Sequence, residues 1–215
     1  MDSTTTLSKR NQPDTRDKLT EELEGWSFYA YISRMRYITR WALMRNSTTE
    51  NIQEHSHMVA VLAHALALIS RVVFGNKTVS PEHCATAALF HDATEIITGD
   101  LPTPVKYYSP EIREAYRKVE EVAEQELLEM LPASLRGFYE PILSNVDPET
   151  ARFVKAADKL SAHIKCLEEM KASNHEFILA ARQTREALDE MEMPELQYFI
   201  DHFLDSFTLT LDELN

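Results

Sequence analysis

The chain has 215 residues, of which 44% are hydrophobic and 27% are charged, as in an ordinary globular domain rather than a disordered chain. Its 22 Lys and Arg against 35 Asp and Glu give a net charge of −13, which argues against binding a nucleic-acid polymer or an anionic membrane. Two cysteines, Cys84 and Cys166, exclude a disulfide framework. Because no secretory or membrane-spanning segment is recognised, we expect a cytoplasmic protein with reduced thiols.

Only four glycines occur in the chain. Sheet proteins need glycine in hairpin turns and bulges, whereas helical bundles need fewer, so the composition favours an all-α fold. Residues 1–24 are polar and show no apolar periodicity, which predicts a mobile N-terminal extension. We therefore expect one folded domain over residues 25–215.

The first predicted helix covers residues 26–39, where apolar side chains recur at helical spacing. The second covers residues 51–74, with Asn51 as its N-cap and Glu54 as the reciprocal partner in a capping box. On this helix His55 shares one face with the apolar residues Val59, Leu62 and Leu66. The side chain of His55 is therefore expected to point into the protein.

The third predicted helix covers residues 81–98 and begins at Ser80-Pro81, a cap followed by a proline in the first turn. His91, Asp92 and Glu95 lie in its last turns at spacings that place them on one side. Residues 99–110 contain three prolines and are predicted to form a loop.

The remaining predicted helices cover residues 111–130, 133–143, 148–172, 175–192 and 194–205. The helix at 148–172 begins at Asp147-Pro148, which repeats the pattern of a cap followed by proline. Asp158 lies beside the apolar stripe of that helix. The predicted architecture is a single-domain helical bundle.

Two histidines and two aspartates thus lie at or beside apolar helix faces: His55, His91, Asp92 and Asp158. Each alone is weak evidence, but buried carboxylates are costly unless they are paired or bound to a metal ion. Imidazole and carboxylate ligands together suit Mn, Co, Fe or Zn, and helical bundles often build metal sites from facing helices. The four residues therefore form a candidate metal site.

A positively charged segment lies between Glu24 and Glu50, where no acidic residue occurs. It contains Arg34, Arg36, Arg40 and Arg45. Arginine binds phosphate through a forked pair of donors, although Arg34 and Arg36 could equally belong to an exposed basic helix face.

The order His55, His91-Asp92, Asp158 resembles that of the HD-domain metal phosphohydrolases. Longer motifs resemble the bacterial 5′-deoxynucleotidase branch of that superfamily over residues 26–210: RWALMRN (40–46), EHS (54–56), HDATEIITGDLPTPVKY (91–107), KAADKL (155–160) and KCLEE (165–169). The resemblance implies a bundle of the HD-domain type, a homodimer and a divalent cation such as Co or Mn. It also implies that His55, His91, Asp92 and Asp158 are the metal ligands.

The same resemblance implies roles at the substrate, a deoxyribonucleoside 5′-monophosphate. It places Arg40 near the phosphate, Trp41 against the sugar where a 2′-hydroxyl would clash, and Asp100 near the 3′-hydroxyl, from where it could assist protonation of the leaving group. The substrate site would further include His55, Asp92, Leu101, Pro102 and Thr103. Glu95 is the candidate proton acceptor, with orientation of a histidine ligand as the alternative.

The expected reaction is therefore metal-dependent hydrolysis of deoxyribonucleoside 5′-monophosphates to deoxyribonucleosides and phosphate. One alternative is another HD-type activity on a triphosphate, a cyclic nucleotide or an alarmone. A second is a non-catalytic metal-binding module, against which the presence of Glu95 and Asp100 argues. A third is a helical scaffold in which the histidines and aspartates coincide by chance.

Overall fold

The computed structural model describes residues 25–106 and 108–214, and the predicted extension at residues 1–24 lies outside them. The described part of the chain is helical, and its only β pairing is an isolated antiparallel bridge between Thr39 and Asn51. The predicted all-α class is confirmed. The first elements are α2 (Phe28–Ile32), the 3₁₀ helix η1 (Ser33–Tyr37), α3 (Ile52–Val72), α4 (Pro81–Phe90), α5 (Glu95–Thr98), α6 (Thr103–Lys106) and α7 (Pro110–Glu129). They are followed by α8 (Ala133–Leu143), α9 (Pro148–Lys171), η2 (His175–Phe177), α10 (Ile178–Asp189), α11 (Pro194–Phe203), η3 (Leu204–Thr208) and η4 (Leu211–Leu214).

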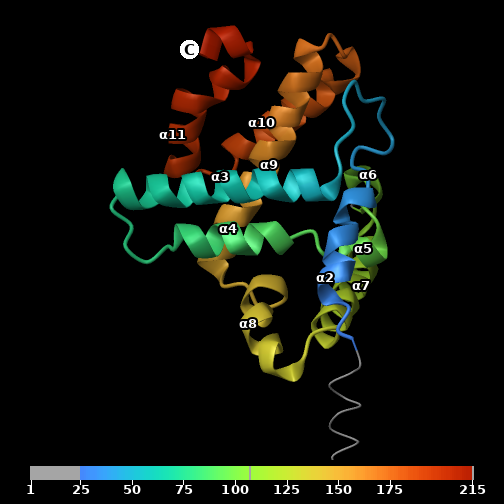
Figure 1. Cartoon of the computed structure of the whole chain (residues 1–215). Helices are drawn as coiled ribbons and strands as arrows, with labels where there is room; N and C mark the ends of the chain where they lie inside the picture. Colours follow the sequence, from blue (N-terminus) through green and yellow to red (C-terminus); the bar gives the residue numbers. More distant parts are fainter. Residues whose placement is uncertain (1–24, 107, 215) are drawn as a thin grey trace, which may run out of the picture.

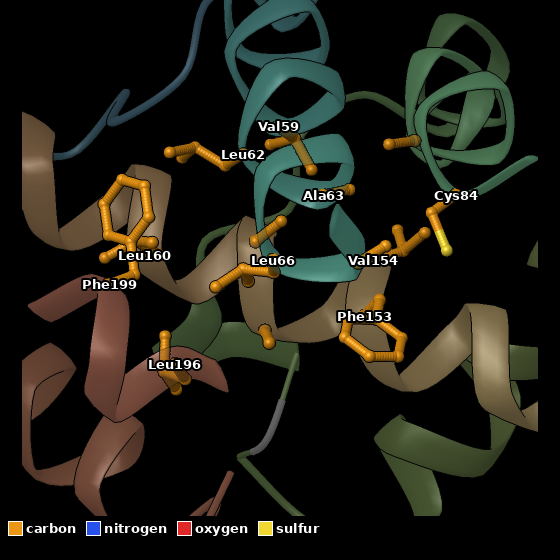
Figure 2. Close-up of a cluster of buried hydrophobic side chains, with 14 of the residues drawn as sticks. Val59, Leu62, Ala63, Leu66, Cys84, Phe153, Val154, Leu160, Leu196 and Phe199 are labelled. Carbon is orange, nitrogen blue, oxygen red and sulfur yellow. The ribbon is translucent and has the colours of Figure 1, made fainter. Parts of the chain in front are cut away.

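Helix α3 is the central element of the bundle, and it packs against α4, α9 and α11 (Figure 1). Its inward face carries Val59, Leu62, Ala63 and Leu66, all buried. Figure 2 shows these side chains meeting apolar residues of α9 and α11, which come from far along the chain. Because the core is built around α3, every residue on its inward face has a fixed position relative to α4 and α9.

By length and composition α3 could cross a membrane, but half of its most apolar stretch of 18 residues is buried inside the protein. This is the property of a core helix, whose apolar face is covered by other helices. Cys84 and Cys166 are likewise buried free thiols, as the sequence predicted.

The predicted helix caps are confirmed. The Asn51 side chain accepts hydrogen bonds from the backbone N–H groups of Gln53 and Glu54, and Glu54 completes the capping box. Ser80 caps α4 and Asp147 caps α9, each with proline in the first turn. These local hydrogen bonds determine where the site-bearing helices begin.

The predicted helix at residues 81–98 is wrong as a continuous element. It is interrupted after Phe90, and α5 begins at Glu95. In the intervening turn Ala93 donates to the carbonyl of Phe90 and Glu95 donates to that of Asp92, three residues back rather than four. This tighter winding turns the chain away from the α4 axis and gives Asp92 and Glu95 directions that a continuous helix would not.

Smaller differences occur elsewhere. The predicted loop at 99–110 contains the single-turn helix α6, and α7 begins at Pro110, where proline is favoured because its first turn needs no N–H donor. The segment predicted as one helix at 26–39 is split into α2 and η1. The helix predicted at 175–192 likewise begins as η2.

The loop between η1 and α3 is held in place by α9. The Glu169 carboxylate accepts hydrogen bonds from the backbone N–H groups of Ser47 (2.8 Å) and Thr48 (3.2 Å). Lys165 pairs with Glu169 and also donates to the Thr48 carbonyl, and both side chains are almost fully buried. Asn174 links Glu169 to the Arg45 carbonyl. One buried ion pair therefore fixes the loop that carries Arg40 and Trp41.

We expect Glu169→Ala to lower the free energy of unfolding at pH 7 by about 3 kcal/mol, because Lys165 is left as a buried, unpaired cation. Burial acts to raise the pKa of Glu169, but hydrogen bonds from Lys165, Ser47 and Asn174 hold it well below the usual 4.5. The stabilisation is therefore present above about pH 4.5 and is lost as the pH falls further.

Chemical denaturation of the two proteins between pH 3 and pH 7 measures this difference. Glu168→Ala, at the exposed neighbouring position, is the matched control and should change the stability by less than about 0.5 kcal/mol. Equal stability losses in the two variants would contradict the assigned role of the Glu169 pair.

Candidate metal centre and active site

Three of the predicted ligands form a compact cluster at the meeting point of three elements. His55 of α3, His91 at the end of α4 and Asp158 of α9 each offer a ligand atom, and these atoms lie within 4.8 Å of one another. The shortest distance, 3.0 Å, joins His55 Nε2 to Asp158 Oδ1. The packing of α3 on α4 and α9 brings them together.

The fourth predicted ligand, Asp92, lies at the edge of this cluster. Its Oδ1 atom is 3.3 Å from His91 Nε2, and its Oδ2 atom is 3.6 Å from His55 Nε2. Arg40 also donates from Nη1 to Asp92 Oδ2 at 3.3 Å. All four predicted residues are thus neighbours, and Asp92 connects the cluster to Arg40.

The histidine hydrogen bonds fit the binding of a divalent cation. His91 Nδ1 donates to the Ala88 carbonyl at 2.7 Å, whereas its Nε2 atom is buried and has no hydrogen-bond partner among the described residues. His55 Nδ1 lies 3.2 Å from Ser161 Oγ, which leaves its Nε2 atom facing Asp158. A histidine ligand typically uses its second nitrogen in this way, which fixes the tautomer that binds metal. The donor set therefore suits a metal ion.

Asp158 is held in the ionised form that a metal ligand requires. Burial acts to raise its pKa, but the hydrogen bond with His55 and the charges of His55, His91 and Arg40 lower it below the usual range. The Asp158 side chain is nevertheless 40% exposed, so the cluster is open to solvent on this side. A small polar molecule can therefore approach the cluster.

Glu95 and Asp100 lie at the two ends of α5, where Gly99 turns the chain with a φ of 75°. Burial, together with the charges of Asp92 and Asp100, raises the pKa of Glu95 to about 9. Its Oε2 atom is buried and has no hydrogen-bond partner within residues 25–106 and 108–214. Burial and Asp92 also raise the pKa of Asp100, while Arg40 opposes this. The negative charge of Asp92 thus acts on both carboxylates.

Arg40 differs from the other arginines of its segment. Arg34, Arg36 and Arg45 are exposed, as the sequence allowed for the first two, whereas Arg40 is partly buried and reaches Asp92. Burial alone would lower the pKa of Arg40, but the carboxylates around it raise it. Arg40 is therefore the arginine that is positioned to act at the cluster.

Trp41 follows Arg40 and lies beside it. Its indole Nε1 donates to Glu50 Oε2 at 2.9 Å, and its ring packs on Phe177 with centroids 5.4 Å apart. The backbone φ of Trp41 is 59°, which is uncommon for a bulky residue. Several contacts therefore hold a strained residue in one orientation.

The GDLPT segment leads from α5 into α6. Leu101 and Pro102 are partly buried, and Thr103 is the first residue of α6, although its side chain lies outside the described structure. The segment is tied to α7 because Lys106 donates to Glu120 at 2.7 Å and Tyr116 donates to the Gly99 carbonyl at 3.4 Å. These contacts position the predicted second wall of the substrate site.

Sequence reasoning missed two residues that contact the site. Ser161 follows Asp158 by three residues on α9, so helical spacing could have placed both on one face. Glu50 is the first acidic residue after the arginine segment, and this position in the sequence was the only indication that it could pair with one of those arginines. Its role depends on how the loop folds back, which no local pattern predicts.

Comparisons with known proteins agree with these observations. A family model described as 5′-deoxynucleotidase YfbR-like matches residues 27–207. A 5′-deoxynucleotidase of Photobacterium profundum is 47% identical over 195 residues, which cover 90% of this chain and all of the relative. A 5′-deoxynucleotidase of Vibrio cholerae is 47% identical over 190 residues, covering 87% of this chain and 97% of the relative.

Solved structures show the same fold. An HD-domain phosphohydrolase from Listeria innocua superposes with a TM-score of 0.73 at 23% identity, covering 84% of this chain and 88% of the other. An HD phosphohydrolase of cyanophage S-2L, solved with dA and one catalytic Zn²⁺ ion, gives a TM-score of 0.58 at 21% identity, covering 82% and 96%. These likenesses confirm the predicted HD-domain type of bundle. Together with the family model and the close relatives, they establish that this chain belongs to the YfbR-like 5′-deoxynucleotidase family.

Proposed function

We propose that this enzyme hydrolyses deoxyribonucleoside 5′-monophosphates to deoxyribonucleosides and phosphate. The observation that carries the proposal is the cluster of His55, His91 and Asp158, with Asp92 joined to Arg40 at its edge, in a chain of this family. A metal cluster beside a guanidinium suits a phosphate ester, because arginine recognises phosphate oxygens.

In this proposal, His55, His91, Asp92 and Asp158 hold one divalent cation, Co or Mn in our expectation. The Nε2 atom of His91 supports this assignment, because it is buried with no hydrogen-bond partner in the described part of the chain and would otherwise lose its hydrogen bond to water. When bound, such a cation acidifies a water molecule and polarises the phosphate ester.

The chain's own groups supply binding and proton transfer. Arg40 anchors the phosphate, while Glu95 accepts a proton as the water oxygen bonds to phosphorus. The bond between phosphorus and the 5′-oxygen breaks, and Asp100 assists protonation of that oxygen. Positive charge at the cluster would lower the pKa of Glu95 from about 9 towards the neutral range in which a general base works.

Trp41 supplies the preference for deoxyribose. We place its ring against the C2′ carbon of the sugar, where a 2′-hydroxyl would clash with it. Leu101, Pro102 and Thr103 form the opposite wall, with His55, Asp92 and Asp100 between. The fixed orientation of the Trp41 indole supports this role, because only a ring that cannot swing aside excludes a hydroxyl.

We place the enzyme in the cytoplasm. Its two cysteines are buried free thiols, which suits a reducing compartment, and α3 presents its apolar face to the protein core. No nucleic-acid polymer or membrane is proposed as a partner, because the net charge of −13 opposes both.

The substrate assignment is tested by phosphate release from paired deoxyribo- and ribonucleoside 5′-monophosphates, with metal-stripped protein and after restoring Mn or Co. We expect metal-dependent release that favours the deoxy series, and Trp41→Ala should reduce that preference about tenfold. Metal binding without release from any monophosphate would reject the proposal. Release from triphosphates or cyclic nucleotides would then support another HD-type activity, and no release at all would support a binding module.

Asp92→Ala and Glu95→Gln separate the metal ligands from the proton acceptor. Loss of a ligand should abolish both metal retention and turnover, whereas Glu95→Gln should keep the metal and lower kcat by about 100-fold or more. Metal content by mass spectrometry and steady-state kinetics measure the two effects. His57→Ala, an exposed histidine of α3, is the control and should retain both properties. A fully active Asp92→Ala protein would reject the assigned metal site.

We propose that two copies of the chain form a homodimer through the outer face of α3. Val61, Leu68 and Val72 lie on that face and are 51%, 45% and 74% exposed, and an exposed apolar stripe of this kind is typical of an interaction surface.

Light scattering should give twice the mass of one chain for the native protein and for the control Ile178→Glu, which alters an exposed residue of α10. Leu68→Glu should give a monomer. A dimer that persists in Leu68→Glu would exclude this face, and a monomeric native protein would reject the assembly.

A further inference from the structure

We propose that Glu50 is a positioning residue whose carboxylate holds Arg40 and Trp41 in one relative orientation and so determines how strictly deoxyribose is preferred. The inference rests on the proposed function, because it concerns the same substrate site. Glu50 is not one of the proposed ligands or proton-transfer groups, and its effect is exerted through its two neighbours.

A single oxygen atom of Glu50 contacts both residues. Oε2 accepts a hydrogen bond from Arg40 Nε at 3.2 Å and another from Trp41 Nε1 at 2.9 Å. The side chains of Glu50 and Arg40 are only 16% and 14% exposed, so water competes weakly for these bonds. Because both donors share one acceptor, the indole and the guanidinium cannot rotate independently.

The backbone of Glu50 reinforces this arrangement. Its carbonyl accepts a hydrogen bond from the Arg40 backbone N–H at 2.9 Å, next to the bridge between Thr39 and Asn51. Trp41, one residue further on, has a φ of 59°. Such a conformation persists in a bulky residue only where the surroundings over-determine it. Glu50 contributes to this from both its main chain and its side chain.

The position of Glu50 also connects sugar recognition to the metal cluster. Its second oxygen, Oε1, lies 4.0 Å from His55 Nδ1, and Arg40 reaches from Glu50 on one side to Asp92 on the other. Removing the Glu50 carboxylate would leave Asp92 as the anion that holds the Arg40 side chain, and would free the indole to turn on Phe177. Both changes act on substrate binding while leaving all four proposed ligands in place.

The kinetic test compares Glu50→Ala, Glu50→Gln and Trp41→Phe in the full-length, metal-loaded protein. We expect Glu50→Ala to reduce the ratio of kcat/KM for deoxyribo- over ribonucleoside 5′-monophosphates about tenfold, chiefly by raising KM for the deoxy substrate, with unchanged metal content. Glu50→Gln should recover part of the ratio, because its amide oxygen still accepts a hydrogen bond. Trp41→Phe keeps an aromatic ring but removes the indole N–H donor. The double variant Glu50→Ala/Trp41→Phe should therefore lose less deoxyribose preference than the two single effects combined.

Glu54→Ala is the matched control. Glu54 lies in the first turn of α3, four residues after Glu50, and its loss removes the capping box. Its carboxylate accepts a hydrogen bond from the Asn51 backbone N–H rather than from Arg40 or Trp41. This variant should be less stable and yet keep the deoxyribose preference. A preference within about twofold of the native value in Glu50→Ala would overturn the proposal, as would an equal loss in Glu54→Ala.

A second readout does not depend on turnover. The Trp41 indole N–H proton resonance, identified by its disappearance in Trp41→Phe, should move upfield and exchange faster with water in Glu50→Ala, while Glu54→Ala leaves it in place. An unchanged resonance in Glu50→Ala would overturn the positioning role. If the native protein releases no phosphate from any monophosphate, the proposed function fails, and this resonance still decides whether Glu50 holds Trp41.

Discussion

Repulsion among carboxylates gathered in one partly buried region is the constraint on which the rest of this structure depends. Burial raises the pKa values of Glu95 and Asp100, and the charge of Asp92 raises both further. The charge of Asp100 also raises the pKa of Glu95. Arg40 opposes the repulsion and is itself held in the charged form by the acidic groups around it. The imidazole Nε2 atom of His91 faces this region without a partner among the described residues. A divalent cation bound there would both satisfy the imidazole and reduce the repulsion.

Helix α9 connects this electrostatic centre to substrate recognition. Asp158 lies in the cluster, while Lys165 and Glu169, two and three turns further along, hold the loop that carries Arg40 and Trp41. The helix therefore fixes the distance between the proposed metal site and the proposed phosphate and sugar contacts. Trp41 adopts an unfavourable φ within that loop, which the buried ion pair and Glu50 together make tolerable.

The turn after α4 positions two groups of the candidate site, Asp92 and Glu95. His91 closes α4 and donates from Nδ1 to Ala88, so its other nitrogen is directed to the cluster. The hydrogen bonds that follow span three residues rather than four, with Asp92 Oδ1 3.3 Å from His91 Nε2 and the Oε2 atom of Glu95 buried. A regular helix through these residues would have kept all of them on one straight face.

The sequence by itself determined the all-α class, the caps of α3, α4 and α9, and the inward direction of His55, because each depends on the periodicity and hydrogen bonding of nearby residues. It also supplied the candidate residues His55, His91, Asp92 and Asp158 through their positions beside apolar faces and through the family resemblance. Only the tertiary structure decided the interruption after Phe90, the anchoring of the loop on Glu169 and the pairing of Glu50 with both Arg40 and Trp41. The loop anchoring and the Glu50 pairing depend on contacts between residues far apart in the chain or on opposite sides of a loop, which no local pattern encodes. The interruption replaces hydrogen bonds spanning four residues with bonds spanning three, a change that apolar periodicity does not reveal.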